Sequence, residues 1–409
     1  MRSCVTLVGL VLLPCAAALA QPAAINGRVV DSYNKPIADA TVLIYEAGVK
    51  HGYSTYCPSC YADCGKRTHT NADGSFSFSG LAPDLFFRLL VVRDGYTAKV
   101  LDRTDPASGA STTAVLHPRK PVEDLSRVAR GLVRNGDGEP LADVVIRPMG
   151  VNTDSSSAYG TLDGLDLVSV TNARGEFEVG YSEKAKGIMV WVEARGMATK
   201  LAPLPTGGAR TTVTVSPGAT VRGRLISNGK PVPNAEVGLI GRERGGFGFQ
   251  FRVFGDPYEE VRIGTQDDGS FVINNVPAPV KWFVYGKMES LNKTGASPLM
   301  ECATSKDGET INVGDLDVRP GHSVRGTVAL SDGAAMPRGM RITISSTKAF
   351  DSQTAVLASD GAFEFRNVPA GDYTVFPSVR GYQLPNEKMT VDAKVGGDVS
   401  DFKLVLDHK

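Results

Sequence analysis

The sequence predicts an all-β protein, built from tandem antiparallel β-sandwiches that follow an export signal. Three observations predict this class. Glycine and proline, with 45 and 24 copies in 409 residues, make up roughly one residue in six, which disfavours long helices. Apolar residues alternate over short segments, and no segment shows a sustained helical period. One order of turn and strand signals recurs four times along the chain.

The first twenty residues have the composition of a secretory signal peptide. Val5–Leu13 form an apolar run that is too short to span a bilayer, and Ala18-Leu19-Ala20 has the small residues that a signal peptidase requires. The mature chain is therefore expected to begin at residue 21. A lipid anchor on Cys15 is the alternative, but Pro14 stands where a small residue is expected. No later stretch is apolar over the length of a membrane span, so we expect an exported protein in the periplasm, at the cell surface or outside the cell.

The repeated signals have the spacing of whole domains. Each repeat begins with a glycine before apolar residues, passes through a turn that contains proline, and reaches a turn of the form x-Gly-x-Phe. The leading glycines are separated by 104, 92 and 103 residues, well beyond the period of about 20 to 50 that solenoid repeats show. In the x-Gly-x-Phe turns, glycine supplies the positive φ of a tight hairpin and phenylalanine returns to the core. The leading glycines are Gly27, Gly131, Gly223 and Gly326, and the turns begin at Asp73, Arg174, Asp268 and Asp360.

Each repeat has the size and turn frequency of one small sandwich of roughly seven strands. The linkers between repeats are short and contain proline, which predicts an extended string of units. The predicted limits are 1–20 for the signal peptide, 21–118 for the first sandwich with a Cys-rich insertion, 122–216 for the second, 218–319 for the third with a Gly/Phe-rich insertion, and 321–409 for the fourth.

The recurring Gly-x-Val, proline-turn and Asp-Gly-x-Phe pattern resembles the carboxypeptidase regulatory-like domain. That family is a transthyretin-like (prealbumin-like), Ig-like β-sandwich grouped near the starch-binding-like sandwiches. The resemblance covers nearly all of the mature chain, and the pattern is most complete in the first and third repeats and least complete in the fourth. It implies an accessory module, found beside peptidase domains and in surface proteins, with no catalytic residues of its own.

Charge and motifs exclude several classes of function. The 44 Lys and Arg balance the 44 Asp and Glu, so the surplus of cations that nucleic-acid binding requires is lacking. None of the five histidines is followed by Glu three residues on, as a carboxypeptidase zinc site requires. Nucleophile-elbow and P-loop motifs are also absent. We therefore expect no enzyme, metal or cofactor, and an enzyme built from scattered loop residues is the remaining catalytic alternative.

The first insertion places Cys57, Cys60 and Cys64 within eight residues. In an exported protein this favours a disulfide that joins Cys64 to Cys57 or Cys60, with the third thiol free or paired with Cys302. A metal or redox site is the alternative, because Cys57-x-x-Cys60 has the spacing of ligands and two histidines are near in sequence.

Aromatic residues in both insertions are candidates for stacking on sugar rings. On a strand, the three phenylalanines of the second insertion alternate and share one face, which either completes the sandwich or forms an exposed platform. The candidates are Tyr53, Tyr56, Tyr61, Phe247, Phe249 and Phe251.

These observations predict a non-catalytic exported module for binding or display at the bacterial envelope. A polysaccharide or an envelope protein is the expected partner, with carbohydrate preferred because of the aromatic insertions. The alternatives are a structural spacer or protein-interaction rod without a small ligand, and a metal or redox role of the cysteine loop.

Overall fold

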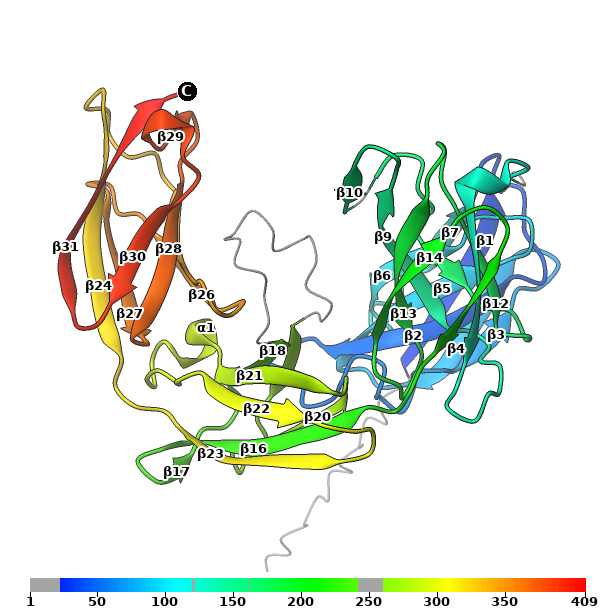
Figure 1. The fold of residues 1–409 in the computed structure, drawn as a ribbon, viewed down its shortest axis with the longest axis horizontal. Helices are drawn as coiled ribbons and strands as arrows, with labels where there is room; N and C mark the ends of the chain where they lie inside the picture. The colour runs from blue at the N-terminus through cyan, green and yellow to red at the C-terminus, as the bar shows by residue number, and fades with distance from the viewer. Residues whose placement is uncertain (1–22, 120–121, 161, 242–259) are drawn as a thin grey trace, which may run out of the picture.

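A computed structural model describes residues 23–119, 122–160, 162–241 and 260–409, which fold almost entirely into β-strands (Figure 1). The strands form four pairs of sheets, and each pair encloses its own apolar core. The predicted all-β fold class is therefore confirmed. The pairs are termed units 1 to 4 in chain order. The predicted signal peptide lies outside the described residues and stays a prediction.

Units 1 and 2 pair a three-stranded sheet with a larger one. In unit 1 the sheets are β4-β1-β7 and β3-β2-β5-β6, and in unit 2 they are β12-β8-β15 and β10-β9-β13-β14, with β11 also paired to β9. The elements of unit 1 are β1 (Ala23–Asp31), β2 (Thr41–Val49), β3 (Arg67–His69), β4 (Ser75–Leu81), β5 (Leu85–Val92), β6 (Lys99–Thr104) and β7 (Thr112–Leu116). Those of unit 2 are η1 (Leu125–Arg127), β8 (Val128–Arg134), β9 (Val145–Asn152), β10 (Ser157–Tyr159), β11 (Ser169–Val170), β12 (Glu176–Gly180), β13 (Gly187–Glu193), β14 (Lys200–Pro205) and β15 (Arg210–Thr214).

Units 3 and 4 repeat this plan with small additions. The sheets of unit 3 are β17-β16-β20, with β23 also on β16, and β19-β18-β21-β22; those of unit 4 are β27-β24-β31-β29 and β26-β25-β28-β30. The elements of unit 3 are β16 (Ala219–Ser227), β17 (Lys230–Pro231), β18 (Glu236–Gly241), β19 (Val261–Gly264), β20 (Ser270–Val276), β21 (Val280–Gly286), α1 (Met288–Leu291), β22 (Met300–Thr304) and β23 (Thr310–Asp317). Those of unit 4 are β24 (His322–Leu330), β25 (Arg341–Ser346), β26 (Ser352–Val356), β27 (Ala362–Val368), β28 (Gly371–Ser378), β29 (Tyr382–Gln383), η3 (Pro385–Glu387), β30 (Val391–Val395) and β31 (Val399–His408).

The first strand of every unit lies between the phenylalanine strand and the last strand. It runs antiparallel to the former and parallel to the latter, as the pairs β1–β7, β8–β15, β16–β23 and β24–β31 show. Antiparallel sheets were expected from the sequence and these parallel pairs were not, because a crossover between strands far apart in sequence leaves no local signal.

The repeated glycine and phenylalanine of the sequence pattern are cross-strand partners. Gly27 lies opposite Phe76, Gly131 opposite Phe177, Gly223 opposite Phe271 and Gly326 opposite Phe363. A Cβ atom on any of these glycines would come within 3.0 Å of the facing ring. The ring therefore occupies the space above the glycine, which explains why the two residues recur together.

The x-Gly-x-Phe turns have the predicted backbone geometry. Gly74 and Gly269 have φ values of 78° and 74°, the left-handed region that favours glycine. The carboxylate of Asp73 accepts the Ser75 N–H at 3.0 Å. In unit 2 Arg174 replaces this aspartate, and the side chain of Asn172, two residues earlier, accepts the Arg174 N–H at 2.9 Å.

The units pack against one another and do not form the extended string that the short linkers predicted (Figure 1). Leu43 and Leu90 of unit 1 share a small apolar cluster with Val145 of unit 2. Units 2 and 3 are joined by the Asn275 amide, which donates to the Gly196 and Pro217 carbonyls at 2.8 and 2.9 Å. Side-chain contacts of this kind fix neighbouring units, and linker composition alone does not reveal them.

The short helix α1 joins units 3 and 4. Met288, which is 1% exposed, belongs to the core of unit 4, whereas Leu291 belongs to the core of unit 3. Met288 and Leu291 are the first and last residues of α1, so this single helical turn contributes a side chain to each of two cores. The backbone N–H of Met288 also donates to the Asp351 carboxylate of unit 4 at 2.9 Å.

Candidate functional site

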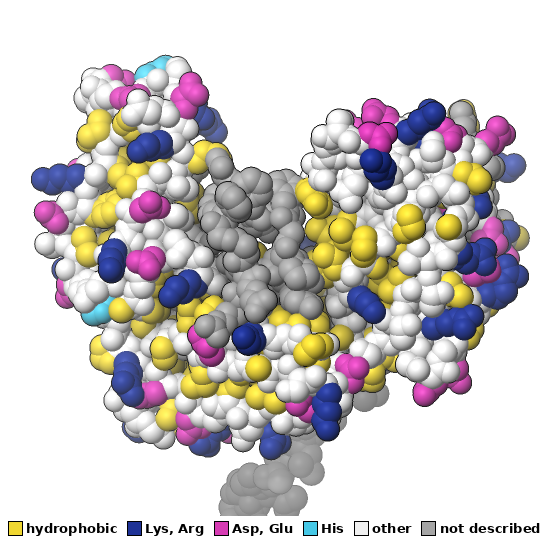
Figure 2. All heavy atoms as spheres, viewed as in Figure 1, with side chains coloured by type: hydrophobic (Ala, Val, Ile, Leu, Met, Phe, Trp, Pro, Cys, Tyr) yellow, Lys and Arg dark blue, Asp and Glu magenta, His cyan; other side chains and the backbone are white. Residues whose placement is uncertain are grey.

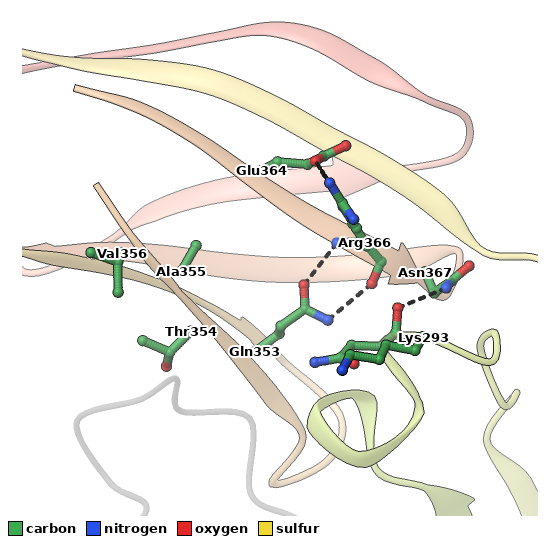
Figure 3. A pocket seen from close by; sticks show the side chains of 9 residues that line it. Lys293, Gln353, Thr354, Ala355, Val356, Glu364, Arg366 and Asn367 are labelled. Atoms are coloured by element: carbon green, nitrogen blue, oxygen red, sulfur yellow. Dashed lines mark hydrogen bonds and ion pairs between the residues drawn. The ribbon is translucent and has the colours of Figure 1, made fainter. Parts of the chain in front are cut away.

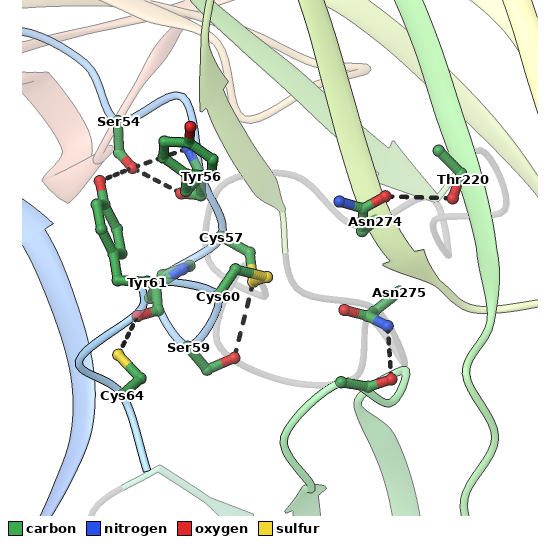
Figure 4. The surroundings of a disulfide bond; sticks show 12 residues. Ser54, Tyr56, Cys57, Ser59, Cys60, Tyr61, Cys64, Thr220, Asn274 and Asn275 are labelled. Carbon is green, nitrogen blue, oxygen red and sulfur yellow. Dashed lines mark hydrogen bonds between the residues drawn. A yellow bond between two sulfur atoms is a disulfide. The ribbon is translucent and has the colours of Figure 1, made fainter. Parts of the chain in front are cut away.

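The Cys-rich insertion follows β2 and folds into a compact loop (Figure 4). Cys57 and Cys60 form a disulfide with a Cα–Cα separation of 5.1 Å. A tight turn brings them together, because the Cys60 N–H donates to the Cys57 carbonyl at 2.9 Å. A hydrogen bond connects the loop to β2, because the Ala47 N–H donates to the Pro58 carbonyl at 2.8 Å.

The predicted pairing of Cys64 was wrong. Cys64 is a free buried thiol directed at the Pro58 carbonyl at 3.4 Å, and Cys302 is a free thiol on β22 of unit 3. The turn from Cys57 to Cys60 satisfies disulfide geometry by itself, while the Cys64 side chain packs into the core of unit 1. Sequence spacing does not distinguish these arrangements, because any two of three close cysteines can satisfy a loop of this length.

The environment of Cys64 does not suit a reactive thiol. Burial raises the pKa of Cys64 to about 11, so little thiolate is present near neutral pH. Within the described ranges, no group of three or more His, Cys, Asp and Glu side chains is arranged to hold a metal ion. The protonated, buried thiol favours a structural role for Cys64 over a redox role.

The three tyrosines of the loop have different surroundings. The hydroxyl groups of Tyr61 and Ser54 form a hydrogen bond of 2.5 Å. The ring of Tyr56 packs edge-on against the ring of Tyr61, with 5.4 Å between the ring centroids. Tyr56 is 59% exposed. The rings of Tyr56 and Tyr61 are inclined by 61°, so they do not form one flat platform.

Tyr53 lies against unit 3. The carbonyl of its neighbour Ser54 accepts the Gly264 N–H at 2.5 Å, and a Cβ atom on Gly264 would lie 2.6 Å from the Tyr53 carbonyl oxygen. Partial burial raises the pKa of the Tyr53 hydroxyl, with smaller contributions from Glu236 and Glu289. The loop therefore connects unit 1 to unit 3, two units that are not consecutive in the chain.

The second group of predicted stacking residues, Phe247, Phe249 and Phe251, lies outside the described residues. Their role in a platform or in a core stays a prediction.

A buried charged cluster at the junction of units 3 and 4 was not predicted from the sequence. The Lys287 ammonium, 5% exposed, donates to Glu260 Oε1 at 2.7 Å and also to the Phe350 carbonyl, and the Tyr285 hydroxyl donates to the same Glu260 carboxylate. Burial raises the pKa of Asp351 to about 7, an effect that nearby Lys287 opposes. Only tertiary packing brings these charges together, so no spacing in the sequence indicates them.

A cavity of about 600 Å³ lies in unit 4 beside α1, where β26 and β27 meet (Figure 3). Its lining mixes amide, charged and apolar side chains and is contributed by β26, β27 and the residues that follow α1. The lining residues are Asn292, Lys293, Gln353, Thr354, Ala355, Val356, Glu364, Arg366 and Asn367. This site was not predicted from the sequence, because an edge strand and an inner strand have the same alternating pattern.

Positive and negative side chains are interspersed over the face shown in Figure 2, without a broad region of one sign. This distribution agrees with the neutral formal charge and lacks the basic stripe typical of a nucleic-acid interface. Among the described residues, no helix has the length and apolar character required to cross a membrane.

Comparison with known families supports the sandwich class for unit 4. Residues 323–405 match the model of the carboxypeptidase regulatory-like domain, which confirms the predicted resemblance for this part of the chain. The match falls on the unit whose short sequence pattern is the least complete. None of the curated proteins compared with the chain matches it in sequence.

The chain also matches several solved structures at low sequence identity. The TIE protein of Bacillus anthracis has a TM-score of 0.20 at 11% identity over 95% of this chain and 74% of that protein. A streptococcal ancillary pilin has a TM-score of 0.22 at 11% identity, over 69% of this chain and 99% of that protein. BcpA, the major pilin subunit of Bacillus cereus, has a TM-score of 0.19 at 10% identity, over 95% of this chain and 100% of that protein. TM-scores this low do not establish a shared arrangement of units.

Proposed function

We propose that this chain is an exported, non-catalytic structural module that displays its units in a fixed relation at the bacterial envelope. The observation that carries the proposal is the insertion of Met288 from unit 3 into the core of unit 4. A flexible string of binding modules has no need of a shared core residue, whereas a rigid array does. The contact of Ser54 with Gly264 between units 1 and 3 supports the same conclusion.

Small-angle X-ray scattering of residues 21–409 tests the rigid array. We expect a profile that a single bent arrangement fits, and we expect Met288→Ala to broaden the distribution of dimensions. The matched control is Met389→Ala, because Met389 is 59% exposed. A wild-type profile that requires a wide range of interunit angles would overturn the proposal.

Glycan binding through the cysteine loop is a second candidate function. It is supported by Tyr56, whose exposed ring is held by the Tyr61 ring, as sugar-stacking residues require. Retention on immobilised plant, bacterial and storage polysaccharides is the measurement. We expect Tyr56→Ala to lose about tenfold in affinity for a retained polymer, as removal of one stacking ring costs of the order of 1–2 kcal/mol.

The control for this candidate is Tyr33→Ala, since Tyr33 is 92% exposed in the same unit but lies far from the loop in sequence. Equal losses in the two variants, or no retention on any polymer, would contradict glycan binding at Tyr56.

A further inference from the structure

The Cys57–Cys60 disulfide has one exposed sulfur residue and one partly buried one. Cys60 is exposed and Cys57 is half-buried, in contrast to the buried Cys64. Because neither sulfur of a disulfide carries a hydrogen, the Ser59 hydroxyl, 3.7 Å from the Cys57 sulfur, is the donor in that contact. The same hydroxyl stabilises a Cys57 thiolate, so Cys57 is suited to leave when an external thiolate attacks Cys60.

The disulfide contributes little as a structural cross-link. It closes a segment of only four residues, and the entropy that a cross-link removes from the unfolded chain rises with the length of the closed segment. A bond from Cys57 to Cys64 would close a segment of eight residues, but Cys64 is free. The end of the cysteine loop is held to β2 without the disulfide, because the Gly65 N–H donates to the Ile44 carbonyl at 2.8 Å. A further role of the bond is therefore worth seeking.

The free cysteines of the described residues, Cys64 and Cys302, do not exchange with this disulfide near neutral pH. Burial raises the pKa of each thiol to about 11, and the thiolate is the form that attacks a disulfide. Cys64 also directs its thiol at the Pro58 carbonyl at 3.4 Å. Opening of the Cys57–Cys60 bond therefore requires a thiol from outside the described chain.

A continuous set of contacts leads from the disulfide to unit 3. Tyr56 and Tyr61 flank the disulfide in sequence and pack ring against ring. The Ser54 hydroxyl contacts both residues, since it donates to the Tyr56 carbonyl at 2.6 Å and forms a hydrogen bond of 2.5 Å with the Tyr61 hydroxyl (Figure 4). The Ser54 carbonyl in turn accepts the Gly264 N–H of unit 3. Because the disulfide fixes the spacing of the two tyrosines, it also fixes the residue that contacts unit 3.

The cysteine loop lies where three units meet. A Cβ atom on Gly52 would lie 2.8 Å from Asn234 Oδ1 of unit 3, and one on Gly65 would collide with the Arg195 guanidinium of unit 2. Asn275, whose amide joins units 2 and 3, is also part of the surroundings of the disulfide (Figure 4). A change in the order of this loop therefore acts on the contacts between units.

We propose that the Cys57–Cys60 disulfide is a redox switch, which an external dithiol opens by thiol–disulfide exchange and which then releases the cysteine loop from unit 3. A thiolate of the dithiol attacks the Cys60 sulfur, and Cys57 leaves as a thiolate beside the Ser59 hydroxyl. The second thiol of the reductant then displaces Cys60. The dithiol is oxidised to its disulfide by two electrons, and its two protons end on Cys57 and Cys60. The inference deepens the proposed function and rests on it, because release of the loop has an effect only where the units are held in a fixed relation.

Amide hydrogen exchange resolved to single residues, on the full mature chain with and without dithiothreitol, tests the switch. The Gly264 N–H donates to the Ser54 carbonyl, so we expect it to exchange about tenfold faster after reduction. The Thr265 N–H is the matched control, because it donates to the Ala235 carbonyl within unit 3 and should keep its rate. Reoxidation with oxidised glutathione should restore the slow exchange of Gly264.

A double variant and a matched single variant extend the test. Cys57→Ser/Cys60→Ser should show the fast Gly264 exchange without reductant and no further response to dithiothreitol. Cys302→Ser removes a free thiol of unit 3 and should respond as the wild type does. Thermal unfolding checks that the variants are folded, and if the double variant is not, the comparison of the reduced and reoxidised wild type decides.

Three results would overturn the switch. One is faster exchange confined to residues 51–65 with Gly264 unchanged, which would make the disulfide a local cross-link of unit 1. Another is equal acceleration of Gly264 and Thr265, which would show a general loosening of unit 3. The third is a disulfide that dithiothreitol leaves intact in the folded chain, as titration of thiols would show.

Scattering separates this proposal from the rigid array. An oxidised chain that requires a wide range of interunit angles would reject the proposed array, and the switch with it. An oxidised chain that fits a single arrangement, but whose Gly264 exchange does not respond to reduction, would reject the switch alone.

Discussion

At the scale of single residues, the glycine and phenylalanine pair is the constraint that recurs in every unit. The ring of Phe177 lies over Gly131, where a side chain would collide with it. Both residues could be recognised in the sequence but their contact could not, because a repeated pattern shows that two positions recur and not that they are partners across a sheet. The hairpin glycines were explained correctly, since their role depends only on local backbone geometry.

Substitution of Gly131 by alanine tests this pairing. We expect Gly131→Ala to lower the free energy of unfolding of unit 2 by about 1–3 kcal/mol, because overpacking displaces the Phe177 ring. Urea unfolding followed by Trp191 fluorescence in a Trp282→Phe background is the measurement. Gly136→Ala is the control, because a Cβ atom at Gly136 would meet no atom within 4 Å. Equal stabilities of the two variants would refute the role assigned to the ring.

At the scale of elements, the cysteine loop shows where sequence-based prediction reaches its limit. Its position, its cysteines and its disulfide-forming character were predictable, because they follow from composition and spacing. The partner of each cysteine and the contact with unit 3 were not, because they depend on a turn at Cys57 and on a strand, β19, that follows about 200 residues later in the chain.

Gly264 provides a test of the loop as a connector. Gly264→Ala places a methyl group against the Tyr53 carbonyl, so we expect the loop to separate from β19. Amide hydrogen exchange in residues 51–65 should then become about tenfold faster, which corresponds to about 1.4 kcal/mol in local stability. Gly48→Ala is the control, since a Cβ atom there would meet nothing within 4 Å. Unchanged exchange in Gly264→Ala would show that the loop is held by unit 1 alone.

At the scale of the whole molecule, the junction of units 3 and 4 combines apolar packing with buried charge. The apolar part was not predicted, because nothing in the sequence around Met288 indicates which core its side chain enters. The charged part, with Lys287, Glu260 and Asp351, makes the junction sensitive to pH.

The direction of this pH dependence follows from Asp351. Its pKa is about 7 in the folded chain and about 4 in an unfolded one, so the folded state holds the proton more tightly between these values. The stabilisation that it contributes is fully present below about pH 4 and is lost as the pH rises towards 7, by up to about 1.4 kcal/mol per pH unit. We expect Asp351→Asn to remove this loss of stability with rising pH, while the amide keeps an oxygen acceptor for the Met288 N–H.

Urea unfolding at several pH values between 5 and 8 measures this effect, with the exposed Asp372→Asn on β28 as the control. Parallel stability curves for the wild type and Asp351→Asn would show that Asp351 does not govern the junction.

The parallel pairing of first and last strands has a mechanical consequence for a chain of such units. Tension applied along the chain enters unit 1 at the start of β1 and leaves at the end of β7, two adjacent strands that run in the same direction. The hydrogen bonds between them lie across the direction of pull, so they resist it together and are not opened one after another. Because all four units share this pairing, the load is borne in the same way along the whole array.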